Sequence, residues 1–139
     1  MKVKRRILTL ATVFMIAALA VTPVFAGNPH FVEVNVTRDG NTLTATGKEA
    51  GLGDESQVHI VVSADAACIN PGSKHPKAAN KESVSAEGDF PVQNGKANFT
   101  LTLTATFQPD CTPPMTLVFT NVTVCDTTHD VCAKVPGTF

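Results

Sequence analysis

The sequence predicts an all-β protein, an immunoglobulin-like (Ig-like) sandwich of two sheets with about seven strands, preceded by an N-terminal signal peptide. Three observations support this fold class. Apolar and polar residues alternate at a period of two along most of the chain after residue 26, and no long stretch shows the period of an amphipathic helix. Turn-forming residues recur between these segments. The 113 residues that follow the leader suit one domain, for which a small closed barrel is the alternative architecture.

Residues 1–26 have the three-part pattern of a secretory signal peptide. An apolar run follows the basic residues Lys2, Lys4, Arg5 and Arg6. Val24-Phe25-Ala26 then forms a cleavage site of bacterial style. The alternative, a membrane anchor, is disfavoured because the apolar run is short for a span of roughly 20 residues and Pro23 interrupts its end. We therefore expect secretion of a single domain, residues 27–139, to the extracellular space or the cell envelope, with no stable membrane insertion.

Removal of this leader leaves an acidic domain. The leader contains four of the eleven basic residues and none of the twelve acidic ones, so residues 27–139 have a formal net charge of −5. Nucleic acids and anionic membranes require clustered Lys and Arg, and we expect neither as a partner. The domain contains no Trp and no Tyr, so Phe must supply the aromatic volume of the core.

The first two strands form a predicted hairpin. Residues 31–38 alternate, and one face of this strand contains Val32, Val34 and Val36. A tight turn at Asp39-Gly40 or Gly40-Asn41 leads to the second strand, residues 42–47.

A glycine-bearing loop, Lys48–Ser56, precedes the third strand, residues 57–64. The pattern then fails between Cys68 and Asp89, where prolines and polar residues predict a long exposed loop, Ile69–Asp89, with at most a short strand near residues 83–86.

The clearest strand is Ala97–Phe107, with apolar residues at every second position and Thr or Asn between them. Asn94-Gly95 predicts a type I′ turn from a short strand at residues 90–92. In the next strand, residues 115–125, the apolar phase shifts by one, which predicts a bulge near Thr120–Asn121. A last strand at residues 131–135 completes a hairpin.

Four cysteines lie in the exported part: Cys68, Cys111, Cys125 and Cys132. An even number in a secreted chain predicts disulfides, with three possible pairings. We favour Cys125–Cys132, because a hairpin would place these residues opposite each other, and this pairing leaves Cys68 with Cys111.

Three segments resemble the secreted neocarzinostatin-type apoproteins of actinobacteria. They are Gly51-Leu52 leading into residues 58–64 with Cys68 shortly after, Ala86-Glu87-Gly88 before a Thr-alternating strand, and residues 124–135. The resemblance implies an Ig-like sandwich. The chain departs from that family in the spacing of its other disulfide, Cys68 to Cys111, and in lacking a counterpart of the aromatic residues of the ligand cleft.

The predicted binding surface lies on loops. Asn70, His75 and Lys77 offer polar contacts in the loop Ile69–Asp89, which a Cys68–Cys111 bridge would tether to the stiff segment Gln108–Pro114. The alternative interpretation of this loop is a solvated linker.

Catalytic and metal chemistry have weaker support. Asp126, His129 and Asp130 could bind a cation, but nothing in the sequence fixes a tetrahedral set, so no metal site is predicted. No serine lies in a nucleophile elbow.

We expect a non-catalytic protein with a binding or structural role, without a cofactor, monomeric, and with an extracellular protein or a small ligand as partner. The alternative is a secreted hydrolase that uses the carboxylates of Glu49, Asp54 and Glu55.

Overall fold

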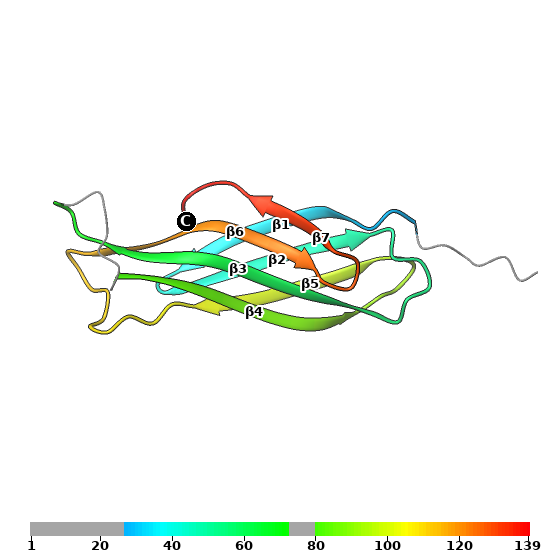
Figure 1. The fold of residues 1–139 in the computed structure, drawn as a ribbon, viewed down its shortest axis with the longest axis horizontal. Helices are drawn as coiled ribbons and strands as arrows, with labels where there is room; N and C mark the ends of the chain where they lie inside the picture. The colour runs from blue at the N-terminus through cyan, green and yellow to red at the C-terminus, as the bar shows by residue number, and fades with distance from the viewer. Residues whose placement is uncertain (1–26, 73–79) are drawn as a thin grey trace, which may run out of the picture.

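Two antiparallel β-sheets pack face to face in a computed structural model that describes residues 27–72 and 80–139 (Figure 1). The expected signal peptide, residues 1–26, lies outside the described residues. The strands are β1 (His30–Asp39), β2 (Thr42–Ala50), β3 (Gln57–Ile69), β4 (Lys81–Pro91), β5 (Ala97–Thr104), β6 (Thr116–Asp126) and β7 (Val131–Val135). Among the described residues, no helix is long and apolar enough to cross a bilayer. The predicted all-β, two-sheet sandwich is confirmed.

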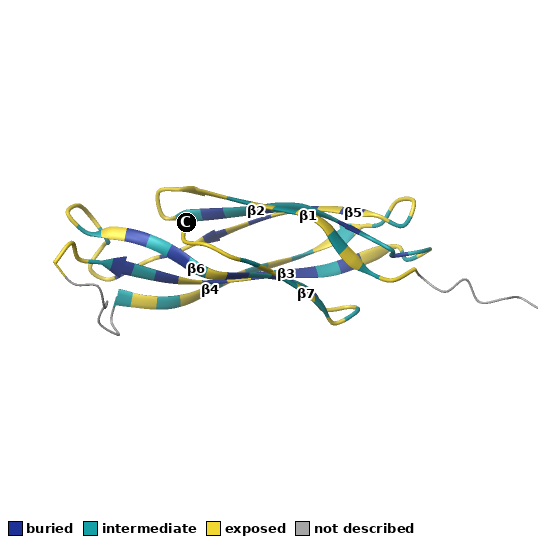
Figure 2. Cartoon of the chain, turned by 90° about the horizontal axis from the view of Figure 1, so that it is seen from above, coloured by how far each residue is buried: buried dark blue, intermediate teal, exposed yellow. Residues whose placement is uncertain are grey.

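The two layers differ in size. One sheet has the strand order β1-β2-β5 and the other β4-β3-β6-β7. Buried and exposed residues alternate along the strands (Figure 2). The buried apolar ones form one hydrophobic cluster with members from both sheets. This alternation is the pattern that the sequence shows, because successive side chains of a strand point to opposite faces of its sheet.

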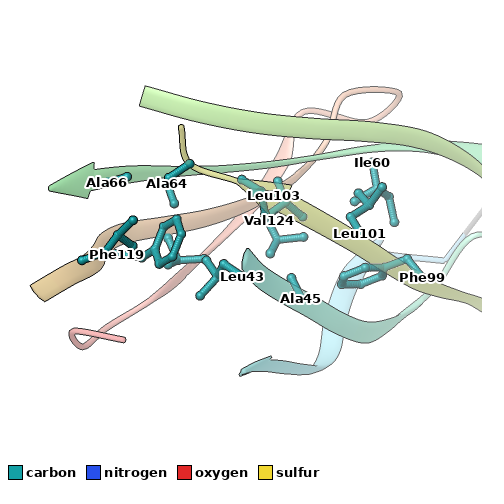
Figure 3. Close-up of a cluster of buried hydrophobic side chains, with 14 of the residues drawn as sticks. Leu43, Ala45, Ile60, Ala64, Ala66, Phe99, Leu101, Leu103, Phe119 and Val124 are labelled. Atoms are coloured by element: carbon teal, nitrogen blue, oxygen red, sulfur yellow. The ribbon is translucent and has the colours of Figure 1, made fainter. Parts of the chain in front are cut away.

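Phenylalanine supplies the aromatic part of the core, as expected from a domain without Trp or Tyr. Phe99, Phe107 and Phe119 are buried, and aliphatic and alanine side chains from both sheets surround the first and last of these (Figure 3). Phe31 packs edge-on against Phe99, with ring centroids 5.9 Å apart. Both sheets therefore contribute to one continuous core.

The expected loop Ile69–Asp89 is wrong at its first residue, which ends β3, and over its second part. β4 (Lys81–Pro91) occupies its second half and pairs with β3 from Gln57↔Pro91 to Ala67↔Lys81. The strand was expected only as short pieces, near residues 83–86 and at residues 90–92, because it lies at the edge of its sheet, where the inward-facing residues are only half-buried, and because Gly88 interrupts their apolar pattern. β3 is correspondingly longer than expected and ends at Ile69.

Two bulges change which side chains face inwards. On β1 the register shifts between Phe31 and Glu33, so Val32 is exposed and the expected face of Val32, Val34 and Val36 is wrong at its first position. On β6 the predicted bulge is confirmed. Ser63 pairs with Thr123 and Asp65 with Thr120, which leaves one extra residue on β6.

Both favoured disulfides are confirmed. Cys68 is bonded to Cys111 and Cys125 to Cys132. Cys125 and Cys132 are directly paired residues of the β6–β7 hairpin. The Cys68–Cys111 bond joins the end of β3 to the segment between β5 and β6.

The predicted type I′ turn at Asn94-Gly95 is also confirmed. Both residues have positive φ angles, and the flanking Gln93 and Lys96 exchange two backbone hydrogen bonds of 2.8 and 3.0 Å. We expect Gly95→Ala to lower the free energy of unfolding by about 1 kcal/mol, because φ is +74° and a Cβ is strained there even though space is available. Gly72→Ala is the control, since that glycine has no positive φ and no neighbour within 4 Å. Urea denaturation of both variants measures the difference, and equal stability of the two would contradict it.

Candidate functional site

Four ionisable side chains gather at one end of the sandwich, the end where β2 and β6 terminate on the right of Figure 1. They are Glu49, Glu55, Asp126 and His129, which we call the acid–histidine cluster. Glu49 and Asp126 are the only buried charged residues in the part of the chain that the structure describes. The cluster is therefore the place where the core departs from apolar packing.

Glu49 lies on the inner face of β2. It follows Leu43 and Ala45 in the same phase of the strand and pairs with Ala97 at the start of β5. Its side chain is fully buried, and neither carboxyl oxygen has a hydrogen-bond donor among the described residues. A buried carboxylate without donors is strongly destabilising, so this side chain must be neutral or must meet a positive charge.

Asp126 faces Glu49 from the other sheet. It is the last residue of β6, pairs with Ile60 of β3 and is fully buried. Its Oδ1 accepts hydrogen bonds from the backbone amides of Thr128, at 2.8 Å, and His129, at 3.2 Å. The carboxylate thus fixes the β6–β7 turn, in the way that Asp commonly organises the residues that follow it.

His129 joins the buried carboxylates to the surface. Its Nδ1 lies 2.5 Å from Oδ2 of Asp126, and its Nε2 lies 2.7 Å from Oε1 of Glu55. The side chains of His129 and Glu55 are 17% and 35% exposed, so the cluster contacts solvent on this side. Glu55 belongs to the β2–β3 loop. This loop is held in place by Leu52, whose side chain is buried and whose backbone amide donates a hydrogen bond to the carbonyl of Gly95.

The surroundings of the cluster favour the protonated forms of Glu49 and His129. Burial, which is the largest cause, and the adjacent carboxyl group of Asp126 together raise the pKa of Glu49 from 4.5 to about 8. For His129, burial alone would lower the pKa, but the bonds to Asp126 and Glu55 outweigh it and the pKa is raised. Glu49 therefore retains its proton at neutral pH, and His129 gains its charge more readily than a free imidazole.

A second histidine lies between two carboxylates on the outer face of the larger sheet. His59 Nδ1 is 2.7 Å from Asp89 and its Nε2 is 2.9 Å from Glu87. These bonds, first the one to Glu87, raise its pKa. All three side chains are at least one-third exposed, so screening by solvent weakens the interaction.

The structure separates the candidate residues of the sequence. Asn70 is exposed just after β3, at the end of the sandwich opposite the cluster, whereas His75 and Lys77 lie outside the described residues. Of the cation candidates, His129 lies beside Asp126, whereas Asp130 is exposed and is not part of the cluster. Among the described residues, the predicted ligand residue Asn70 and the cation candidates therefore do not form a common site.

The expected loop Lys48–Ser56 is wrong at its start. Glu49 is not a loop residue, because β2 continues to Ala50 and places its side chain in the core. The sequence contained a signal for this position: Glu49 continues the inward phase of Leu43 and Ala45. Its encounter with Asp126, by contrast, depends on the packing of two sheets, which no local pattern shows.

Two surface hollows lie elsewhere. One is lined by residues of β6, β7 and the segment that follows it, and the other by residues of β3, β4 and β6, and neither contains a member of the acid–histidine cluster.

No protein-family model, no curated protein and no solved structure matches the chain.

Proposed function

We propose that the chain is an exported, non-catalytic β-sandwich protein that acts by binding or as a structural element outside the cytoplasm or in the cell envelope. The observation that carries this proposal is the burial of Glu49. Its side chain is fully buried beneath the β6–β7 hairpin, whereas a general acid must come within hydrogen-bond distance of its substrate.

The two disulfides support export, because such bonds persist in oxidising compartments. The basic and apolar leader of residues 1–26 supports the same conclusion.

An Ig-like topology is part of the proposal. In such sandwiches, strands that are neighbours in sequence are divided between two antiparallel sheets. The orders β1-β2-β5 and β4-β3-β6-β7 follow this division, with crossings between the sheets after β2, β4 and β5. The loops then collect at the two ends of the sandwich, where binding sites of such domains are commonly found.

The alternative is a secreted hydrolase that uses Glu49 and Glu55. Glycosidases hold two carboxyl groups on either side of a cleft that admits the substrate. Glu55 is half-exposed and suits such a role, but His129 separates it from the buried carboxylates. Substrate would therefore have to displace the β6–β7 hairpin to reach Glu49.

A hydrolysis screen of the exported protein tests the proposal. The full-length chain is expressed in a bacterial host, the exported fraction is purified, and its turnover of esters, glycosides and peptides is compared with that of Glu49→Gln and Glu55→Gln. We expect a mass that begins at Gly27, two disulfides, and no turnover that depends on either carboxylate. Turnover abolished by either substitution would overturn the non-catalytic proposal, and retention of residues 1–26 in a cytoplasmic protein would overturn export.

A further inference from the structure

The acid–histidine cluster places two carboxyl groups where water does not reach them, beside a histidine that contacts solvent. Glu49 and Asp126 are both fully buried and face each other from opposite sheets, and Glu55 adds a third carboxyl group through His129. Both oxygens of Glu49 lack a donor. Such an arrangement is stable only if a proton or a cation compensates the charge.

We propose that Glu49, Asp126 and His129 bind a divalent transition-metal ion of the zinc class. This inference deepens the binding role proposed above, on which it rests, by naming the class of ligand. One ligand atom from each of the three side chains lies within 4.8 Å of the others. Once Glu49 releases its proton, a cation with two positive charges would neutralise the two buried carboxylates and would be the partner that the oxygens of Glu49 lack.

The distances are compatible with such an ion. Bonds of about 2.1 Å in a tetrahedral centre place neighbouring ligand atoms about 3.4 Å apart. Nδ1 of His129 and Oδ2 of Asp126 are closer than this, at 2.5 Å. To bind the same ion, these two atoms would have to move apart by about 1 Å. The turn of residues 127–130 supplies that movement, because His129 lies on the hairpin between β6 and β7 and not within a strand.

Glu55 has the position of an outer carboxylate. A histidine that binds a metal through one nitrogen usually bonds a carboxylate with the other, which orients the ring. The 2.7 Å bond from His129 Nε2 to Glu55 is of this kind. Glu55 is therefore a positioning residue, and the partly exposed side of His129 leaves a route for the ion and a place for a fourth ligand such as water.

The donor atoms select the class of ion. Imidazole nitrogen with carboxylate oxygen suits Zn²⁺ and its transition-metal neighbours, whereas Ca²⁺ and Mg²⁺ take oxygen ligands and in larger number. We therefore expect Zn²⁺ and Co²⁺ to bind and Ca²⁺ and Mg²⁺ not to compete.

Competition with a chromogenic chelator tests the proposal on the exported protein after removal of metals. We expect one Zn²⁺ per chain, and affinity reduced at least about 100-fold in His129→Gln and Glu49→Gln and about 10- to 100-fold in Glu55→Gln. His59→Gln is the matched control, because His59 also lies between two carboxylates but outside the cluster. Its Zn²⁺ affinity should remain within a few-fold of wild type.

A spectrum of the wild-type protein with Co²⁺ keeps the test valid if a variant fails to fold. Intense visible absorption, displaced by Zn²⁺, is expected of a four-coordinate site. Absence of Zn²⁺ binding, or binding that His59→Gln abolishes and His129→Gln preserves, would overturn the site. Zn²⁺-dependent hydrolysis at an intact site would instead overturn the non-catalytic proposal and leave the cation site standing.

Discussion

Replacing Glu49 by Gln is expected to stabilise the protein at alkaline pH. In buffer with a chelator at pH 9, the variant should exceed wild type in free energy of unfolding by roughly 4–5 kcal/mol, which is the energy of a pKa shift from 4.5 to about 8 in a fully buried carboxyl. Below about pH 4.5 the difference should largely disappear. Gln is neutral at every pH, and its amide has nearly the size and shape of the protonated carboxyl group.

The sign follows from proton linkage. The folded protein binds the Glu49 proton more tightly than the unfolded chain, so the associated stability is fully present below the unfolded pKa and is lost as the pH rises through the folded one. His129 acts in the same direction, because its pKa is also raised. A smaller loss of stability above pH 6.5 should therefore remain in Glu49→Gln.

Denaturant unfolding at pH 5, 7 and 9 measures this dependence. Asp54→Asn is a suitable control, since Asp54 is an exposed carboxylate in the neighbouring loop. It should follow the wild-type pH profile. A flat wild-type profile, or a Glu49→Gln variant less stable than wild type at pH 9, would contradict the burial of a protonated Glu49.

Removing the Cys68–Cys111 disulfide is expected to be the second large effect. The bond joins residues 43 positions apart, and the loop-entropy relation gives about 4 kcal/mol for a loop of this size. The Cys125–Cys132 bond spans 7 positions, for which the same relation gives about 2.4 kcal/mol. Removal of the Cys68–Cys111 disulfide should therefore lower the free energy of unfolding more than removal of the Cys125–Cys132 disulfide.

The two double variants, Cys68→Ala with Cys111→Ala and Cys125→Ala with Cys132→Ala, serve as controls for each other. Their free energies of unfolding, measured by denaturant titration, should differ by about 1.5 kcal/mol. The burial of Cys68 adds to the difference in the same direction. Equal losses, or a greater loss for the hairpin disulfide, would contradict this account.

The extent to which the sequence predicted the fold follows the strength of its local patterns. The predicted strand Ala97–Phe107 alternates without interruption, and the structure contains it as β5, which ends three residues earlier at Thr104. The Asn94-Gly95 turn and the β6 bulge have equally local causes. β4 was expected only as short pieces because an edge strand with half-buried residues and a glycine differs little from a loop. Val32 was misplaced because a one-residue bulge leaves no mark in the pattern of β1.

The candidate site was predicted less well, for a physical reason. His129 and Asp126 were recognised as neighbours on a hairpin, but their association with Glu49 and Glu55 arises only when the two sheets pack. Solvated carboxylates are the ordinary expectation for a polar loop, and this expectation is wrong for Glu49 because the strand extends to Ala50. Inward phase at a strand end was the one local indication of its burial.

The ionisation of Glu49 is the most direct test of this account, because the cluster, the pH dependence and the cation site all depend on a buried, unpartnered carboxyl group. Its titration can be followed by carbon-detected NMR of the side-chain carboxyl in chelator-treated protein, with Glu49→Gln to assign the resonance. We expect a midpoint near a pKa of about 8. A midpoint near the ordinary pKa of 4.5 would show that Glu49 is solvated and would contradict the account.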